Sequence, residues 1–523
     1  MVSVVGLLAL AAVIIYLVRG VRQYLVLRQF KGPPLSGFTR YLMFKANTSG
    51  RLDEYYKDWT DKYGSTCRIG PNMLLTKDIA VIKQINAVRG GYSRGDWFKA
   101  VRLHPTEDNI TTYMDDKAHT RVRQALAPGY AGKENLYLEK DIDTTVLKLV
   151  ELIQSKYLST PTKYVPFDLA RTSSFFTLDT LSTVAFGRSF GFLDKDGDPF
   201  DYLETSKWFW PLAQVIATFP ELHNITYIPW AQRLWPTADD AQGLGAIMHF
   251  AKQIVAERFG PDKIIRKDML GSFLKNGLSQ TQIEAESLIQ ISAGSDSTAT
   301  AIRMAILHIA TNPRVLATLL HELESALAAG AVARPVIRDQ EARALPYLQA
   351  CIKEALRIVP PAAGLLPKKA PPRGDVVAGR FVPGGTQVGW SILGLMRDAA
   401  IFGDDAHLFR PERWLHADEA TYARMVEAQG AVFGTGKHGC LGRHVATFEL
   451  DKAIAELVLR FEWEVANVKR PYRDQCLGFY LQDDLFFRVT ERKVGAREVD
   501  VAAWKKKTAE RKDFGMETKW EDL

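Results

Sequence analysis

The sequence predicts a mainly helical protein with a minor β component. Residues 279–311 have the pattern of one long helix, and residues 141–273 have mostly helical periodicity. Residues 360–409 combine repeated Pro and Gly with short apolar runs, which are typical of small strands and turns. With 523 residues, 47% of them apolar, the chain is long enough to bury a deep core.

The N-terminal segment, residues 2–18, is almost wholly apolar, and no basic residue precedes it. Four basic residues follow it: Arg19, Arg22, Arg28 and Lys31. A cleaved signal peptide has a charged start and a small-residue cleavage site, so we expect a retained transmembrane anchor over residues 1–20. As a helix, the seventeen residues 2–18 span ~26 Å, close to the thin hydrocarbon layer of the endoplasmic reticulum. The basic flank would keep the rest of the chain cytoplasmic. A buried core helix is the alternative.

The segments that flank the main body are expected to be a hinge and a tail. Residues 21–34 form a basic, proline-containing hinge, because Lys31-Gly32-Pro33-Pro34 stiffens the chain as it leaves the membrane. Residues 498–523 form a charged C-terminal tail, and its lysine run at 505–507 is typical of a solvated end.

Charge and cysteine usage exclude some classes of protein. The formal net charge is +7, but apart from the two ends the basic residues are dispersed. Nucleic-acid binding would need a clustered basic stripe with interleaved aromatic residues, so we expect no nucleic-acid partner. The four cysteines show no paired spacing, which indicates a reducing compartment.

The helical region 141–273 contains a run that is unusually rich in aromatic residues. Its members are Tyr202, Trp208, Phe209, Trp210, Phe219, Tyr227, Trp230 and Trp235. Aromatic rings suit a membrane interface, since they are apolar with a polar handle, but they suit a protein core equally well. Both interpretations stay open.

The long helix at 279–311 carries an unusual polar centre. Ser279 with Gln282 forms a predicted capping box at its start, and Asn312-Pro313 ends it. Its middle reads Ala293-Gly294-Ser295-Asp296-Ser297-Thr298. A mid-helix glycine costs up to ~1 kcal/mol, so a glycine beside an acid and several hydroxyls calls for a functional reason. The alternative is that small polar residues merely ease helix packing.

A glycine-rich loop with a single cysteine follows later in the chain. It reads Phe433-Gly434-Thr435-Gly436-Lys437-His438-Gly439-Cys440-Leu441-Gly442 and precedes an apolar helical pattern. Glycines allow a tight turn close to a flat cofactor, and N–H groups facing the sulfur would hold it as thiolate. A phosphate loop is excluded, because Ala431 and His438 stand where that motif needs Gly and Ser or Thr. Zinc held with His438 and His444, or an ordinary turn with a buried thiol, remain alternatives.

The cysteine loop resembles the haem-binding signature of the cytochrome P450 family, with Cys440 as the axial ligand of the haem iron. The polar centre of the long helix resembles the oxygen-binding motif of the same family. Glu354-Ala355-Leu356-Arg357 resembles its Glu-x-x-Arg helix, and Phe409-Arg410-Pro411-Glu412-Arg413-Trp414 resembles the segment that supplies Arg413 to a Glu354, Arg357, Arg413 ion-pair network. Alone, Glu354 and Arg357 would read as a surface helix pair.

The resemblance implies the cytochrome P450 fold (α+β), built as one haem-thiolate catalytic domain over residues 35–497. It implies that Asp296 and Ser297, with Thr298 as a possible partner, deliver protons. It also implies a cofactor-binding set: His119, Arg123, Ala293, Gly294, Phe433, Gly434, Gly436, His438 and Gly442. Two positions depart from the usual pattern, because the family more often has Thr at position 297 and Arg at position 438.

The implied activity is that of a monooxygenase that uses haem b, dioxygen and electrons from NADPH to oxidise a hydrophobic small molecule. The implied partners are NADPH-cytochrome P450 reductase and membrane lipid, and the implied location is the endoplasmic reticulum membrane, single-pass, with a cytoplasmic catalytic domain. Arg121, Arg123, Lys437 and Arg443 are expected to face an acidic reductase.

The family position of the pocket implies an apolar lining from Trp97, Phe98, Ile289, Ala293, residues 364–366 and residues 478–480. The aromatic run would belong to a mobile lid that touches the bilayer. The sequence is most similar to filamentous-fungal members, many of which act in secondary metabolism. A haem-thiolate isomerase or dehydratase that does not use dioxygen, and a non-catalytic haem-binding protein, are the alternative functions.

Overall fold

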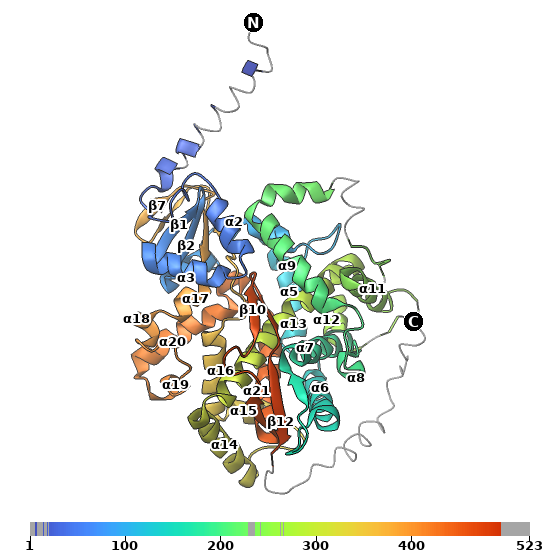
Figure 1. Cartoon of the computed structure of the whole chain (residues 1–523). Helices are drawn as coiled ribbons and strands as arrows, with labels where there is room; N and C mark the ends of the chain where they lie inside the picture. Colours follow the sequence, from blue (N-terminus) through green and yellow to red (C-terminus); the bar gives the residue numbers. More distant parts are fainter. Residues whose placement is uncertain are drawn as a thin grey trace.

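The computed structural model describes residues 24–492 except 228–235, 241, 262 and 265, together with a few positions before residue 24. Helices dominate it (Figure 1). The described α-helices are α2 (Tyr41–Thr48), α3 (Leu52–Tyr63), α4 (Ile79–Asn86), α5 (Asp116–Tyr130), α6 (Leu138–Leu152), α7 (Leu169–Phe186), α8 (Phe192–Lys195), α9 (Tyr202–Thr218), α11 (Gly243–Ala256), α12 (Met269–Lys275), α13 (Gln280–Ala310), α14 (Pro313–Ala328), α15 (Asp339–Arg343), α16 (Pro346–Ile358), α17 (Ile392–Met396), α18 (Ala399–Phe402), α19 (Arg413–His416), α20 (Glu419–Gly430) and α21 (Arg443–Arg460).

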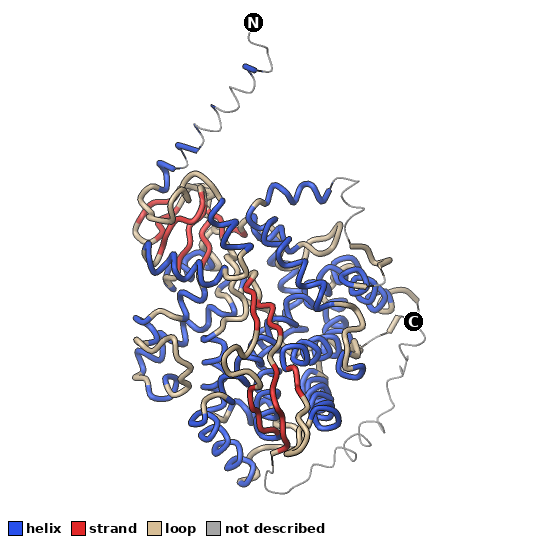
Figure 2. The backbone as a smooth tube through the Cα atoms, in the orientation of Figure 1, coloured by secondary structure: helices blue, strands red, loops and turns tan. Residues whose placement is uncertain are grey.

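The strands gather in two places (Figure 2). One is a five-stranded sheet in the order β1 (Thr66–Gly70), β2 (Met73–Thr76), β8 (Gln387–Trp390), β5 (Lys368–Lys369) and β3 (Ser93–Arg94), with the hairpin β6 (Asp375–Val377) and β7 (Arg380–Val382). The other comprises β4 (Pro166–Asp168), β12 (Phe486–Glu491) and β9 (Phe461–Val465), with the pair β10 (Arg473–Cys476) and β11 (Tyr480–Asp483). The predicted minor β component, including short strands within 360–409, is confirmed.

Helix α13 forms the axis of the core. It begins after the Ser279–Gln282 capping box, ends at Ala310 and packs against α7, α11, α16 and α21. The predicted limits and cap are therefore confirmed. Nearly every residue from 283 to 307 is buried, and the buried side chains outside the polar centre include the polar Glu286, Gln290 and Arg303.

The ion-pair network lies in the half of the molecule that contains α16 and α19. Glu354 accepts two hydrogen bonds from Arg357, at 2.8 Å each, and one from Arg413 at 3.0 Å. Trp414 Nε1 donates to the same carboxylate at 2.9 Å. All of these side chains are buried, and the Arg357 guanidinium also donates to the carbonyl oxygens of Met396 and Ala406. The network thus joins α16 to the segments 396–414.

Most residues at the two ends of the chain lie outside the part that the structure describes. Within the residues that the structure describes, no helix is long and apolar enough to cross a bilayer. Most of the predicted anchor, residues 1–20, falls outside the described residues, as does the predicted tail, 498–523. The transmembrane helix therefore stays a prediction.

Candidate active site

The polar centre of α13 is the part of this helix that is open. Between residues 283 and 307, only 292–294 and 297 are not buried, although neighbouring turns of the helix are fully enclosed. A Cβ atom on Gly294 would come no closer than 3.4 Å to Leu181, an ordinary contact. The glycine is therefore not needed for packing within the protein. The structure leaves room beside this turn of the helix.

The cysteine loop places its sulfur beside the start of α21. The Cys440 N–H donates to the Phe433 carbonyl at 2.7 Å and closes the loop. Gly436 has φ +62°, and a Cβ there would lie 1.9 Å from the Asn86 carbonyl oxygen, so only glycine fits. The turn therefore brings the backbone against the end of α4.

Cys440 is exposed, whereas the other three cysteines are buried. It is nevertheless deep among protein atoms, so its exposure is to an interior opening. Burial raises the pKa of its thiol, while the N–H group of Gly442, the charge of Arg123 and the N–H group of Arg443 act in the opposite direction. A positive metal ion would complete this balance and hold the sulfur as thiolate.

A group of buried cations and histidines lies next to the loop. His119 and His438 have ring centroids 4.7 Å apart, and none of their four ring nitrogens has a hydrogen-bond partner. Arg94 and Lys368 lie beside them, 6% and 1% exposed. The sequence analysis missed these two residues, which stand directly opposite each other in the antiparallel pair β3 and β5. We call His119, His438, Arg94 and Lys368 the cation group.

The pKa values show that the cation group is electrostatically unfavourable by itself. Burial, and then the charges of Arg94 and Arg123, lower the pKa of His119 to about 3. Burial and Lys368 depress the pKa of His438 further. Burial lowers the pKa of Arg94 to about 9 and that of Lys368 well below its usual value. A bound anion would stabilise the cation group, because burying polar groups without partners costs free energy.

These residues fit haem. The two propionates of haem are the anions that unpartnered histidine nitrogens beside buried cations would bind. Cys440 supplies an open thiol, and the turn at 292–294 and 297 supplies an uncovered helix face. Arg123 is half-buried on the same helix as His119 and interacts electrostatically with Cys440. Arg94 and Lys368 would thus compensate for the histidine at position 438.

Replacing Lys368 by methionine separates haem binding from folding. We expect haem to leave the variant about 10–100-fold faster, because a charge-assisted hydrogen bond of ~1.5–3 kcal/mol is lost. The apoprotein should be as stable as wild type or more so, since a buried unpaired cation becomes apolar. Haem transfer to apomyoglobin and urea unfolding of the apoprotein measure the two effects.

The matched control for that variant is Lys369→Met. Lys369 is the next residue on β5 but forms an ion pair with Asp96 at 2.9 Å and lies more exposed. Its replacement should leave haem loss unchanged. Unchanged haem loss in Lys368→Met, together with a destabilised apoprotein, would contradict the role of Lys368.

The acid of α13 is enclosed. Asp296 is 5% exposed, and its Oδ2 atom has no hydrogen-bond partner. Burial raises its pKa to about 6, against the charge of Arg303 and the hydrogen bonds of Trp210 and Tyr202. The neighbouring Ser297 Oγ donates to the Ala293 carbonyl at 2.7 Å. Thr298, the next residue, is buried.

Several predicted pocket residues meet in space. Trp97 lies against Gly364, where a Cβ atom would be 3.2 Å from its ring, and the Ala363 N–H donates to the Gly478 carbonyl at 2.8 Å. Trp210 of α9 stacks near Phe479, with centroids 4.8 Å apart. Phe98 differs, because its ring faces the Arg94 guanidinium at 4.5 Å and the Lys368 ammonium at 4.8 Å. The Phe98 ring therefore packs against Arg94 and Lys368 of the cation group.

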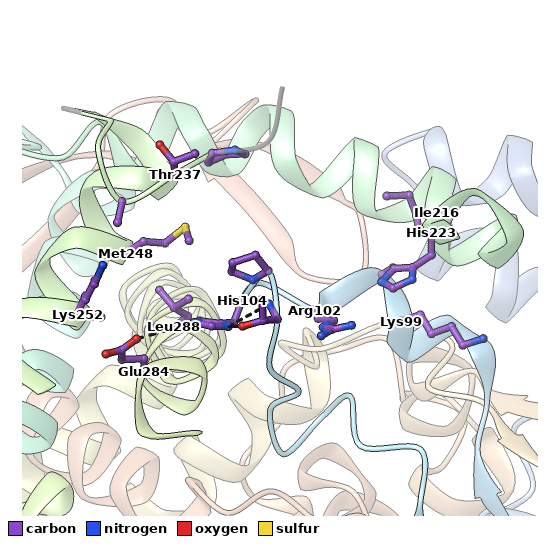
Figure 3. A pocket seen from close by; sticks show the side chains of 16 residues that line it. Lys99, Arg102, His104, Ile216, His223, Thr237, Met248, Lys252, Glu284 and Leu288 are labelled. Carbon is purple, nitrogen blue, oxygen red and sulfur yellow. Dashed lines mark hydrogen bonds and ion pairs between the residues drawn. The ribbon is translucent and has the colours of Figure 1, made fainter. Parts of the chain in front are cut away.

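A cavity of about 350 Å³ lies against α13 (Figure 3). Ile216, Met248 and Leu288 supply apolar walls from α9, α11 and α13, while His104, Arg102 and Lys99 come from the segment after η1 (Asp96–Val101) and its end. Leu288 precedes Ala293 by five residues, ~7.5 Å along the helix axis. The cavity therefore meets α13 about one and a half turns before its open turn.

Two expectations from the sequence are corrected. Lys437 does not face a partner surface, because its ammonium pairs with Asp116 at 2.6 Å and is largely buried. It fixes the cysteine loop to the first turn of α5. The zinc alternative also fails, since the described residues contain no group of three or more His, Cys, Asp or Glu side chains placed to hold a metal ion.

The fold and the site together define a haem-thiolate enzyme: one accessible cysteine at the start of a helix, an open turn of a long buried helix, and a buried cation group. Comparison with known proteins agrees. The family model described as Cytochrome P450 matches residues 31–486. The chain belongs to the cytochrome P450 family.

Its relatives include named monooxygenases from fungi. Cytochrome P450 monooxygenase ABA1 of Pyricularia oryzae is 38% identical over 497 residues, covering 93% of this chain and 96% of the relative. Cytochrome P450 monooxygenase aba1 of Botryotinia fuckeliana is 35% identical over 469 residues, covering 89% and 92%. Cytochrome P450 monooxygenase abl1 of Leptosphaeria maculans is 34% identical over 445 residues, covering 84% and 78%.

The family assignment confirms the predicted class of enzyme. The chain is a haem-thiolate monooxygenase that uses haem iron, dioxygen and electrons from a redox partner to oxidise a small molecule. The isomerase, dehydratase and non-catalytic alternatives are not favoured, since the relatives are named monooxygenases.

Proposed function

We propose that the chain oxidises a hydrophobic small molecule at the open turn of α13, with Cys440 as the axial ligand of haem b. The observation that carries this proposal is the coincidence of the only open turn within residues 283–307 with an accessible Cys440 and a cation group whose histidine nitrogens have no hydrogen-bond partner. The catalytic domain comprises residues 35–497. His119, Arg94, Lys368 and His438 would hold the two propionates.

The chemistry divides between the cofactor and the chain. When bound, thiolate-ligated haem iron supplies the reductive activation of dioxygen. Asp296 and Ser297 supply protons to the open turn. Because burial raises the pKa of Asp296 to about 6, both its neutral and its ionised form are accessible near neutral pH. Ser297 must release the Ala293 carbonyl, 2.7 Å away, to pass a proton on.

The apolar lining supports a hydrophobic substrate. Trp97, Trp210 and Phe479 surround the glycine contacts at 364 and 478, so few polar groups are available to orient a ligand there. The cavity beside Leu288 is the proposed entrance, since it lies between α9, α11 and α13 (Figure 3). Comparing the metabolites of fungal strains with and without the gene would identify the substrate. Its place in secondary metabolism rests on resemblance to fungal enzymes.

Membrane attachment is proposed from the apolar N-terminal segment and a group of exposed apolar side chains. These are Leu35, Phe38 and Tyr41 near α2, Val376 and Phe381 on the β6–β7 hairpin, and Leu222 and Ile225 on η3 (Pro220–Tyr227). The β6–β7 hairpin contacts the hinge that follows the N-terminal segment, since Gln29 donates to the Phe381 carbonyl. We place the chain in the endoplasmic reticulum membrane, single-pass, with residues 35–497 and the tail 498–523 in the cytoplasm. Recovery of the full chain in the soluble fraction would contradict this.

The proposed electron donor is an NADPH-cytochrome P450 reductase. Arg443 at the start of α21, three residues after Cys440, is exposed, and so is Arg121 on α5. Exposed cations of this kind suit an acidic partner protein. Lys437 does not contribute, because Asp116 neutralises it.

The proton-delivery assignment is tested by Asp296→Asn and Ser297→Ala. With reductase, NADPH and the identified substrate, we expect Asp296→Asn to slow product formation by ~10²–10⁴-fold, the usual contribution of a positioned proton donor. Both variants should divert electrons to hydrogen peroxide, since the haem still receives electrons while protons arrive in the wrong place. Product and peroxide formed per NADPH are the measurements.

Thr298→Val is the matched control, because it removes the neighbouring hydroxyl from a buried position. It should leave product formed per NADPH unchanged. Unchanged coupling in Ser297→Ala, with uncoupling in Thr298→Val, would transfer the role of the hydroxyl to Thr298.

A further inference from the structure

A tyrosine from a different helix lies beside the proposed proton donor. Tyr202 is the first residue of α9 and is 5% exposed. Its hydroxyl lies 2.8 Å from Ser295 Oγ on α13, and both side chains are buried. Ser295 precedes Asp296 directly. This contact joins two helices whose residues are far apart in sequence, at the point where α13 carries its acid.

The direction of this hydrogen bond follows from the other partner of Ser295. Ser295 Oγ lies 2.9 Å from the Ile291 carbonyl oxygen. A carbonyl only accepts, and a serine hydroxyl has a single proton, so Ser295 donates to Ile291. Tyr202 must therefore donate its own proton to Ser295.

Asp296 competes for the same phenolic proton. Asp296 directly follows Ser295, and its Oδ2 atom is buried without a hydrogen-bond partner, so it is a second acceptor next to the Tyr202 contact. Tyr202 and Trp210 of α9 both act to lower the pKa of Asp296, against the effect of burial. When Asp296 is ionised, it can accept the Tyr202 proton. When Asp296 is neutral, Tyr202 can keep its proton on Ser295 and accept one from the acid. The single phenolic proton thus has two alternative acceptors.

The charges around Asp296 come from few elements. On α13 itself, Arg303 is buried, but its guanidinium donates to Ser173 Oγ at 2.7 Å and to the Ala170 carbonyl at 2.6 Å on α7. Asp168 and Asp483 interact with Arg303 in turn. On α9, Tyr202, Trp210 and Ser206 face the site. The Arg303 guanidinium is therefore held by α7, while Tyr202 and Trp210 are the α9 groups that lower the pKa of Asp296.

We infer that Tyr202 is a positioning residue for the proton donor: its hydroxyl proton, shared between Ser295 and Asp296, sets whether Asp296 is charged or neutral. This inference rests on the proposed role of Asp296 in proton delivery. It also makes that role depend on α9, because a displacement of α9 would remove the phenolic donor from the acid.

Two substitutions should shift the titration of Asp296 in opposite directions. Tyr202→Phe removes a donor to the ionised carboxylate, so Asp296 should become neutral at a pH about one unit higher. Ser295→Ala removes the competing acceptor, so Tyr202 can donate to Asp296 alone. Asp296 should then stay ionised to a lower pH. A general loosening of the contact between α9 and α13 would shift the Asp296 titration in the same direction in both variants.

The experiment is a pH titration of the haem-loaded full-length chain by difference infrared spectroscopy. The C=O stretching band of a protonated carboxylic acid that is missing from Asp296→Asn identifies the Asp296 signal. Tyr347→Phe is the matched control, because it deletes another phenol that donates to a carboxylate, at 2.6 Å from Glu412. It should leave the Asp296 signal where it is in wild type.

Trp210→Phe provides a second variant if Tyr202→Phe does not fold. Removing the indole donor should also move the Asp296 titration to higher pH. Shifts of the same sign in Tyr202→Phe and Ser295→Ala, no shift in Tyr202→Phe or Trp210→Phe, or a titrating band that survives in Asp296→Asn would each overturn the inference.

A separate measurement distinguishes this inference from the proposed function. If Asp296→Asn leaves peroxide released per NADPH unchanged, the role of Asp296 in proton delivery fails, whatever the infrared shifts show. If Asp296→Asn increases peroxide release while Tyr202→Phe titrates like wild type, the proposed function stands and the role of Tyr202 fails.

Discussion

Cys440→Ala should abolish both monooxygenase turnover and the red-shifted absorption band of the reduced carbonyl complex. The band reports a thiolate opposite the bound gas, and Cys440 is the accessible cysteine of this chain. The Gly442 and Arg443 N–H groups favour the thiolate form of Cys440, and alanine at this position offers them no sulfur. Visible spectra of the reduced, carbon monoxide-treated protein measure the loss.

Haem should still be bound by the Cys440→Ala variant, though more weakly. The cation group that would hold the propionates is untouched by the substitution, so haem content and the carbonyl band should separate. Cys351→Ala, at a buried cysteine of α16, is the matched control and should keep the band. A red-shifted band that persists in Cys440→Ala would refute the ligand assignment.

Glu354→Ala should have the largest effect on stability. We expect the free energy of unfolding to fall by ~3–5 kcal/mol, because Arg357 loses its carboxylate partner while buried, and Arg413 loses one of two. The Trp414 indole N–H is left without its acceptor as well. Urea unfolding of the haem-loaded protein is the measurement.

The pH dependence of that effect has a definite sign. The Arg357 and Arg413 guanidiniums outweigh the burial of Glu354 and hold its pKa below the usual value. A lowered pKa contributes stability that is fully present above the unfolded value of ~4.3 and is lost as the pH falls through the folded value. The difference between Glu354→Ala and wild type should therefore persist from pH 8 to pH 5.

Glu204→Ala is the control for Glu354→Ala. Glu204 pairs with Lys207 at 2.7 Å on the exposed face of α9, where an ion pair is worth less than ~1 kcal/mol. Its removal should barely change unfolding. Equal urea midpoints for the two variants would contradict the structural role of the buried network.

Features encoded by contiguous residues could be predicted from the sequence. The capping box fixes where α13 begins, and Asn312-Pro313 fixes where α14 takes over, because these are local backbone signals. The cysteine loop is also a run of contiguous residues, 433–442, although the close contact that requires glycine at 436 is made with Asn86 of α4. Both required no knowledge of the tertiary fold.

Features that depend on tertiary contacts could not be predicted from the sequence. Arg94 and Lys368 meet only because β3 pairs with β5, and nothing near either residue marks it as buried. Tyr202 meets Ser295 through the packing of α9 on α13. Lys437 is predicted to face the reductase because it is a basic residue of the cysteine loop, but its ion pair with Asp116 depends on the packing of α5 against that loop. Residues 1–20 stay a prediction, since the structure describes few of them.

X-ray absorption at the iron edge of the purified, haem-loaded full chain tests the central claim most directly. A single sulfur neighbour of iron in wild type, absent from Cys440→Ala and retained in Cys351→Ala, is the predicted result. An iron coordinated only by nitrogen and oxygen in wild type would contradict the account.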